Sequence, residues 1–189
     1  MAADTKTALL NSAEMAARAH GYDGFSYADL AKDVGIRKAS IHHHFPSKAS
    51  LALALMERYR QDFKKTCEEI DDAQTTGGAK IKALIARYEA ALEGGRSLCL
   101  CVSLSTSRES LRGDVVAQMR LFREMMIGWL TLAFQEAKTD GTIHGLYDPA
   151  QEARAALALL EGAQLSARAQ EDPAFFQTSV ALLLGRISD

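Results

Sequence analysis

The sequence predicts an all-α protein of about nine helices, and three observations support this fold class. Apolar residues recur at helical spacing through nearly every segment. The strict alternation of apolar and polar residues that marks a half-buried strand is almost absent. Each of the three prolines, Pro46, Pro149 and Pro173, stands where a helical pattern begins.

Turn and capping residues set the boundaries of the first four expected helices. Ser26 can cap a short helix, because its hydroxyl can accept from a backbone N–H of the first turn. Gly35 suits the left-handed residue that ends this helix. Pro46 ends the next one, since proline disfavours helical geometry in the residue before it. The first four expected helices are therefore 5–20, 27–34, 37–44 and 47 to about 72.

The rest of the chain contains five more expected helices. Residues 75–78 form the clearest linker of the chain, and Gly94 with Gly95 ends the helix that follows it. Segment 98–110 mixes apolar and small hydroxyl residues, and we interpret it as a short helix. Acidic residues can cap the last three helices: Asp114, Asp148 and Asp172. The expected helices are 79–93, 98–110, 115 to about 138, 149–169 and 173–187.

The helix pair within residues 25–51 has a second helix that is polar and basic where a core helix would be apolar. Its outward side chains can donate hydrogen bonds or carry positive charge, which suits a helix lying among the phosphates of a DNA major groove. With Ser26 at the start of the first helix and Lys48 beyond the second, the expected DNA contacts are Ser26, Arg37, Lys38, Ser40, His42, His43 and Lys48.

Composition fits this interpretation and narrows the class of protein. The 189 residues are 48% hydrophobic with a net charge of −2, so a wholly basic coat is excluded. Residues 1–65 nevertheless hold 10 Lys+Arg against 7 Asp+Glu, although ordinary charge scatter can also produce this excess.

No stretch approaches the roughly 18 apolar residues of a membrane span, and no secretion signal is recognisable, so we expect a cytoplasmic protein. Three cysteines are too few for a disulfide framework.

Residues 5–52 resemble the TetR family of transcriptional regulators, because many independent positions agree in one order. The matching positions are Ser26, Ala31, Gly35, His43-His44-Phe45 and Lys48. The resemblance implies a helix-turn-helix DNA-binding domain over 1–50 and a helical ligand-binding and dimerisation domain over 51–189. The helix from about 47 to 72 would link the two.

The function that follows from this resemblance is a homodimeric transcriptional regulator, and we expect a repressor. Its two heads would enter successive major grooves roughly 34–36 Å apart on an operator. A small molecule or a thiol modification would release it from the operator DNA. The alternative is a small-molecule or redox-sensing binding protein with a vestigial DNA-binding head.

His42 departs from the family pattern, which usually has tyrosine at this position. An imidazole N–H can contact a phosphate as a hydroxyl does, and a protonated ring adds charge to the bond. We therefore expect DNA affinity to fall as the pH rises through the range in which histidine loses its proton.

Metal, cofactor and enzyme chemistry find little support in the sequence. Successive residues on a helix point about 100° apart, so the rings of His42, His43 and His44 cannot converge on one ion. There is no Gly-rich phosphate loop, nucleophile elbow or HExxH motif. We expect no metal, no cofactor and no catalytic activity.

Cys99 and Cys101 admit two interpretations. Free cysteine is among the most buried residue types, so both can simply be small core residues. Alternatively, one of them senses oxidants or electrophiles, with Arg96 close enough in sequence to lower the thiol pKa. The resemblance favours the second possibility somewhat, since a Cys-Leu pair recurs here in one branch of the family.

The helix expected over 115–138 is rich in methionine and aromatic residues, which are as often plain core as the wall of a ligand pocket. As ligand-lining candidates we select Tyr88, Met119, Phe122, Met126 and Trp129, with Arg87 or Arg123 as a polar anchor. The helices 149–169 and 173–187 are rich in Ala and Leu, and we expect them to form a four-helix dimer interface. Burial of both faces within one subunit is the alternative.

Overall fold

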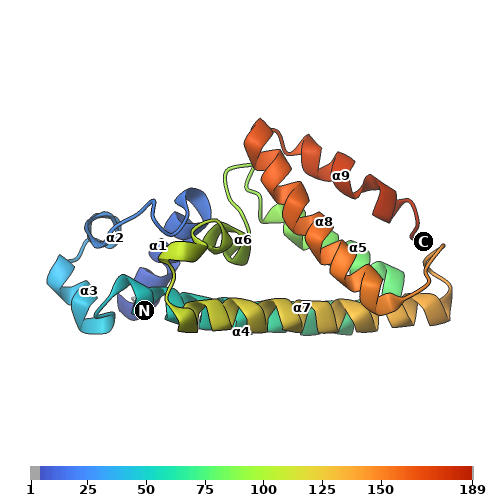
Figure 1. Ribbon diagram of the computed structural model, residues 1–189, viewed down its shortest axis with the longest axis horizontal. Helices are drawn as coiled ribbons and strands as arrows, with labels where there is room; N and C mark the ends of the chain where they lie inside the picture. The colour runs from blue at the N-terminus through green and yellow to red at the C-terminus, as the bar shows by residue number, and fades with distance from the viewer. Residues whose placement is uncertain (1–4, 189) are drawn as a thin grey trace. The chain divides into compact units, whose positions relative to one another are not determined.

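A computed structural model describes residues 5–188, and the remaining residues, 1–4 and 189, lie outside the described part. Within that range the chain forms nine α-helices and one short 3₁₀ helix, and its only β-type pairing is an isolated bridge between Ile143 and Ile187 (Figure 1). The predicted all-α class is confirmed. The elements are α1 (Thr5–His20), α2 (Tyr27–Val34), α3 (Lys38–His44), α4 (Lys48–Ala73), α5 (Gly77–Ala90), α6 (Leu100–Ser105), η1 (Arg108–Ser110), α7 (Gly113–Asp140), α8 (Pro149–Gln170) and α9 (Ala174–Leu184). None of these helices has both the length and the apolar composition needed to cross a lipid bilayer.

One compact unit consists of the described residues up to Gln61 together with Leu100–Leu121. Its apolar core draws on α1, α2 and α3, whose fully buried side chains include Leu9, Ala13, Leu30 and Ile41. Arg58 of α4 donates to Asn11 at 2.8 Å and to Glu14 at 2.7 Å on α1. The Ser103 hydroxyl of α6 donates to the Ala17 carbonyl of α1. Both α4 and α6 are therefore tied to α1 by polar contacts as well as by packing.

The other compact unit consists of Asp62–Cys99 and the described residues from Phe122 onward. Here α8 packs along α9, and α5 contacts both. The core side chains with no exposed surface include Leu84, Phe134, Leu157 and Phe176. Two of the three boundaries between the units fall inside α4 and α7, so these two long helices contribute residues to each unit.

Gly77 and Gly78 correct the predicted linker, because they form the first turn of α5. A Cβ on Gly77 would lie 2.1 Å from the Ala137 backbone nitrogen and 2.4 Å from the Ala133 carbonyl oxygen of α7. Gly77 therefore allows two helix backbones to approach closely, and neither glycine is a loop residue. The Gly-Gly pair suggested a linker, but the reason for these glycines is their close contact with a distant part of the chain.

The later helix starts agree with the sequence in part. Asp148 caps α8 as predicted, since its carboxylate accepts from the backbone N–H two residues on, at 2.9 Å. Asp172 accepts from the Ala174 N–H at 2.9 Å, but α9 begins at Ala174, one residue later than predicted. The prediction for Asp114 was wrong, because α7 begins at Gly113 and Asp114 lies within its first turn. The segment predicted as one short helix over 98–110 divides into α6 and η1.

Candidate nucleic-acid interface

The start of α2 is held by a reciprocal pair of contacts between Ser26 and Asp29. The Ser26 hydroxyl oxygen accepts from the backbone N–H groups of Ala28 and Asp29, at 3.2 and 3.4 Å. The Asp29 carboxylate accepts from the Ser26 backbone N–H at 2.8 Å and from its hydroxyl at 2.7 Å. These bonds lower the pKa of Asp29. The predicted cap is confirmed, and the hydroxyl proton of Ser26 is already donated within the protein.

The turn between α2 and α3 follows the predicted geometry. Gly35 has φ 72° and ψ 33°, and its N–H donates to the Ala31 carbonyl at the end of α2. Ile36 donates to the same carbonyl at 3.0 Å. The φ of Gly35 lies in the left-handed region, which glycine adopts without the strain that a Cβ brings.

Helix α3 buries one residue of its middle turn and exposes most of the others. Ile41 has no exposed surface and anchors the helix to the core. The side chains of five predicted DNA contacts are all exposed: Arg37, Lys38, Ser40, His42 and His43. Arg37 is the N-cap residue but makes no side-chain capping bond. The resulting surface combines two permanent cations, a hydroxyl and two imidazoles on one short rigid helix.

His42 is oriented by contacts on two sides. Its Nδ1 lies 3.3 Å from the Pro46 carbonyl oxygen, and its ring meets the ring of Tyr27 edge-on, with the centroids 5.0 Å apart. A carbonyl oxygen can only accept, so this contact requires the proton on Nδ1. In the neutral ring Nε2 is then an acceptor, and only a protonated ring can donate from Nε2 to a phosphate oxygen.

Lys48, also a predicted DNA contact, is oriented toward the interior of its unit. Its ammonium group lies 4.2 Å from the centroid of the Phe25 ring and 4.8 Å from that of Tyr22, and it donates to the Phe25 carbonyl. Burial is the largest effect on the Lys48 pKa and lowers it, while Asp23 and Asp29 oppose that shift. This aromatic contact was not predicted, because Phe25 lies 23 positions before Lys48 and Tyr22 lies further still.

The ligand-lining candidates do not all gather in one cluster. Tyr88 and Phe122 both contact the Phe63 ring edge-on, at centroid distances of 5.9 and 5.4 Å. Trp129 instead donates from its indole nitrogen to Asp71 at 3.0 Å. Met126 is fully buried in the same unit, and Met119 is buried in the part of α7 that belongs to the other unit. Phe63 was not predicted, because it lies on α4, far in sequence from the methionine-rich helix α7 that its ring contacts.

The two candidate anchors for a ligand also differ from each other. Arg123 pairs with Glu161 of α8, with 2.5 Å between the guanidinium and carboxylate atoms. Arg87 is exposed near the end of α5.

Cys99 and Cys101 are both buried, as is Cys67, and none of the three forms a disulfide bond. Burial raises the pKa of Cys67 to about 12. Cys99 is held by Gln164 of α8, which has no exposed surface. The Gln164 side chain accepts from the Cys99 backbone N–H at 2.8 Å and donates to the Tyr88 carbonyl at 2.8 Å. Gln164 was missed from the sequence, where it is one polar residue in a helix rich in alanine.

Comparisons with known proteins agree with the helix-turn-helix geometry. A family model described as bacterial regulatory proteins, tetR family, matches residues 9–55. A transcriptional regulator of the TetR family from Agrobacterium tumefaciens shares 31% identity and superimposes with a TM-score of 0.92, covering 98% of each chain. The HTH-type transcriptional repressor NemR of Escherichia coli K12 is 27% identical over 170 residues, which cover 87% of this chain and 84% of NemR.

A further relative is the negative transcriptional regulator IcaR of the Staphylococcus aureus biofilm operon icaADBC. It is 28% identical over 127 residues, covering 62% of this chain and 63% of IcaR. The full-length agreement with the Agrobacterium protein extends the likeness well beyond the DNA-binding segment. The chain belongs to the TetR family of bacterial regulatory proteins.

Proposed function

We propose that this protein is a homodimeric transcriptional repressor that leaves its operator when an effector acts on the domain formed by residues 51–189. The observation that carries the proposal is the exposed surface of α3 and its N-cap, with Arg37, Lys38, Ser40, His42 and His43, on a helix pair whose first helix is capped by Ser26 and whose second is anchored by Ile41. The relatives NemR and IcaR are both described as repressors, which supports repression over activation.

In this proposal residues 1–50 bind DNA through α3 and the start of α2. Arg37 and Lys38 contribute permanent charge, so much of the affinity comes from phosphate contacts and falls steeply with salt. Lys48 acts differently from the other predicted contacts, because its ammonium is held by Phe25 and Tyr22. In this position Lys48 stabilises the DNA-binding segment. Its ammonium group would have to leave the Phe25 and Tyr22 rings to reach a phosphate.

The proposed dimer forms through the outward faces of α8 and α9. On α8 these faces carry small residues, including Ala155, Ala158 and Gly162, with Leu165 at 42% exposure. On α9 they carry Phe175 and Leu182, at 44% and 85% exposure. Apolar side chains so exposed on adjacent helices favour a symmetric four-helix contact with a second copy.

Effector release would act through the compact unit that contains Asp62–Cys99 and the described residues from Phe122 onward. In this unit the Phe63 ring contacts both Tyr88 and Phe122. Either an apolar ligand bound among these rings or a modified Cys99 or Cys101 would favour a conformation with a different head spacing. An effector can only do so by binding that conformation more tightly. If Cys99 and Cys101 are the sensors, release by a quinone is lost in the Cys99→Ser, Cys101→Ser double variant and retained in Cys67→Ser.

The DNA-binding proposal is tested by a mobility shift with the DNA upstream of the protein's own gene. We expect Arg37→Ala and Lys38→Ala each to weaken binding and to reduce the salt dependence by about one counterion. Lys65→Ala is the matched control, because Lys65 is an exposed cation on α4 that makes only a long ion pair, 3.9 Å, with Asp62. Equal losses in all three variants, or none, would contradict α3 as the contact surface and favour a binding protein with a vestigial head.

A further inference from the structure

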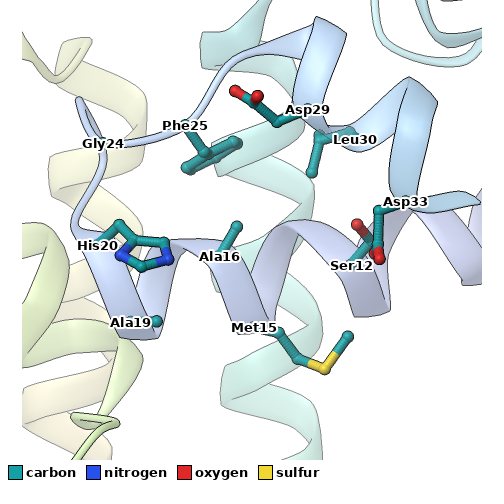
Figure 2. A pocket seen from close by; sticks show the side chains of 10 residues that line it. All are labelled: Ser12, Met15, Ala16, Ala19, His20, Gly24, Phe25, Asp29, Leu30 and Asp33. Carbon is teal, nitrogen blue, oxygen red and sulfur yellow. The ribbon is translucent and has the colours of Figure 1, made fainter.

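A pocket of about 500 Å³ opens between α1 and α2, and none of its lining residues belongs to α3 (Figure 2). Its volume lies within the range of small-molecule sites in proteins. The lining residues come from three consecutive pieces of the chain: α1, the loop that contains Gly24 and Phe25, and α2. All of them belong to one compact unit.

One part of the pocket is apolar. Phe25 and Leu30 are buried and contribute to the lining, together with Ala16 of α1. Met15 also lines the pocket, and 62% of its surface is exposed. A flexible thioether at this position can close over a bound apolar group.

The other part of the pocket is acidic. Asp29 and Asp33 are four residues apart on α2 and line the same pocket, as Figure 2 shows, and no Lys or Arg is among the lining residues. Within the described part of the chain, Asp33 makes no ion pair. Both Ser26 bonds to Asp29 end on Oδ2, so Asp29 Oδ1 and the Asp33 carboxylate present negative charge beside an apolar surface, with His20 as the one basic side chain of the lining.

Ser12 provides a further polar group in the pocket. Its residue is only 5% exposed and lines the pocket from α1. Among the contacts described for residues 5–188, the Ser12 hydroxyl has no hydrogen-bond partner, whereas helical serines and threonines elsewhere, such as Thr131 and Ser179, donate to a carbonyl one turn back. The Ser12 hydroxyl is not one of the fully enclosed unpaired polar atoms of the described residues, so it is open to a ligand group that enters the pocket.

We propose that this pocket binds a small organic cation, an ammonium group joined to an aromatic or aliphatic body. The ammonium would lie at Asp29 and Asp33, and the Ser12 hydroxyl oxygen would accept one of its hydrogen bonds. The apolar body would lie against Phe25 and Leu30. A ligand that contacts both α1 and α2 stabilises their packing, so binding raises the thermal stability of the unit.

The proposal is tested with benzylammonium, and with benzyl alcohol and phenylacetate as its neutral and anionic counterparts. The measurement is a two-dimensional NMR titration of the deuterated full-length protein at low salt. We expect benzylammonium to shift the amide signals of α1 and α2, and added salt to weaken binding because exposed carboxylates are screened. Asp33→Asn should weaken binding about fivefold, in line with the modest strength of partly exposed ion pairs.

Asp72→Asn is the control for net charge, because Asp72 is an exposed residue near the end of α4 and does not line the pocket. Ser12→Ala tests the hydroxyl separately and leaves the overall charge unchanged. The proposal is overturned if benzyl alcohol binds as well as benzylammonium, if the shifted signals lie outside α1 and α2, or if the Asp33 and Asp72 variants lose affinity equally. Selective binding of a basic peptide in place of benzylammonium would overturn it too, since the pocket would then recognise a protein segment. None of these outcomes depends on operator binding.

Discussion

His42 meets Tyr27 edge-on, with ring centroids 5.0 Å apart and an angle of 63° between the planes. Tyr27 is itself fixed, because its hydroxyl donates to the Phe45 carbonyl at 2.9 Å. An exposed imidazole of α3 is therefore held by a buried residue of α2, and the Pro46 carbonyl holds its Nδ1. This arrangement leaves Nε2 as the atom that faces a partner, and its role changes with protonation.

We predict that operator affinity decreases between pH 6 and pH 8 and that His42 accounts for much of the decrease. The imidazolium can donate from Nε2 to a phosphate and adds a positive charge, whereas the neutral ring offers only a lone pair there. Fluorescence anisotropy with labelled operator at several pH values measures the effect. The pH slope should be smaller in His42→Tyr.

His43 and His44 also carry imidazole rings and lie on the same helix, with their rings 5.5 Å apart, so they need their own control. His43→Gln should lower affinity at pH 6 yet retain the slope that His42 contributes. An unchanged slope in His42→Tyr would show that the pH dependence comes from another group.

Substitutions at Ser26 separate its capping role from its predicted DNA contact. Ser26→Ala should destabilise the protein by about 1 kcal/mol, because the first turn of α2 loses its acceptor. Ser26→Asn retains a capping oxygen, since asparagine is as good an N-cap residue as serine. Thermal unfolding measures the cap, and operator affinity of the folded variants measures the contact. If Ser26→Asn keeps full DNA affinity, Ser26 acts through the cap alone.

The helix pair of the DNA-binding segment was predictable because its signals are local. Ser26, Gly35 and Pro46 each act through bonds or sterics within a few residues, and the bounds of α2 and α3 agree with the prediction to within one residue. The orientation of Lys48 was not predictable in the same way. It depends on Tyr22 and Phe25, which only the folded chain brings to its ammonium group.

The difference between local signals and contacts made only in the folded chain also explains why the linker predicted at residues 75–78 was wrong. A Gly-Gly pair has the composition of a flexible turn, but at Gly77 the absence of a Cβ serves a contact with α7 some 60 positions later in the chain. Gln164 is a similar case, since its partners Cys99 and Tyr88 lie on segments distant in sequence. Patterns within one helix do not reveal such contacts.

We predict opposite effects of alanine at two glycines. Gly77→Ala should destabilise the protein by about 1–3 kcal/mol, because the new Cβ would meet backbone atoms of α7 that cannot move aside easily. Gly128→Ala, inside α7, should stabilise it by about 0.5–1 kcal/mol, since nothing lies within 4 Å of its Cβ position and alanine favours the helix. Chemical denaturation measures both. Similar values for the two variants would contradict the close approach of α5 and α7.

We predict that a charge at the centre of the proposed α8–α9 interface prevents dimer formation. Leu182 is 85% exposed in the single chain, and Leu182→Glu would place two carboxylates in a symmetric contact, one from each copy. Sedimentation velocity should show a shift from dimer to monomer, and operator affinity should fall because two heads no longer bind together. Leu132→Glu on α7, where Leu132 is 60% exposed, is the control and should remain dimeric. A dimer that persists in Leu182→Glu would exclude this face.

Gln164 should control the reactivity of Cys99 as well as stability. Gln164→Leu leaves the Cys99 N–H and the Tyr88 carbonyl without their partner, so we expect a loss of about 1–3 kcal/mol in unfolding free energy. Cys99 is 1% exposed, and a segment freed from α8 would open more often and expose its thiol. The rate of labelling by a maleimide, measured in a Cys67→Ser, Cys101→Ser background, should therefore rise in Gln164→Leu.

Gln164→Glu retains an acceptor for the Cys99 N–H but loses the donor to Tyr88, and its labelling rate should be intermediate. A lower stability with an unchanged labelling rate would mean that Gln164 supports the core without restraining the cysteine segment.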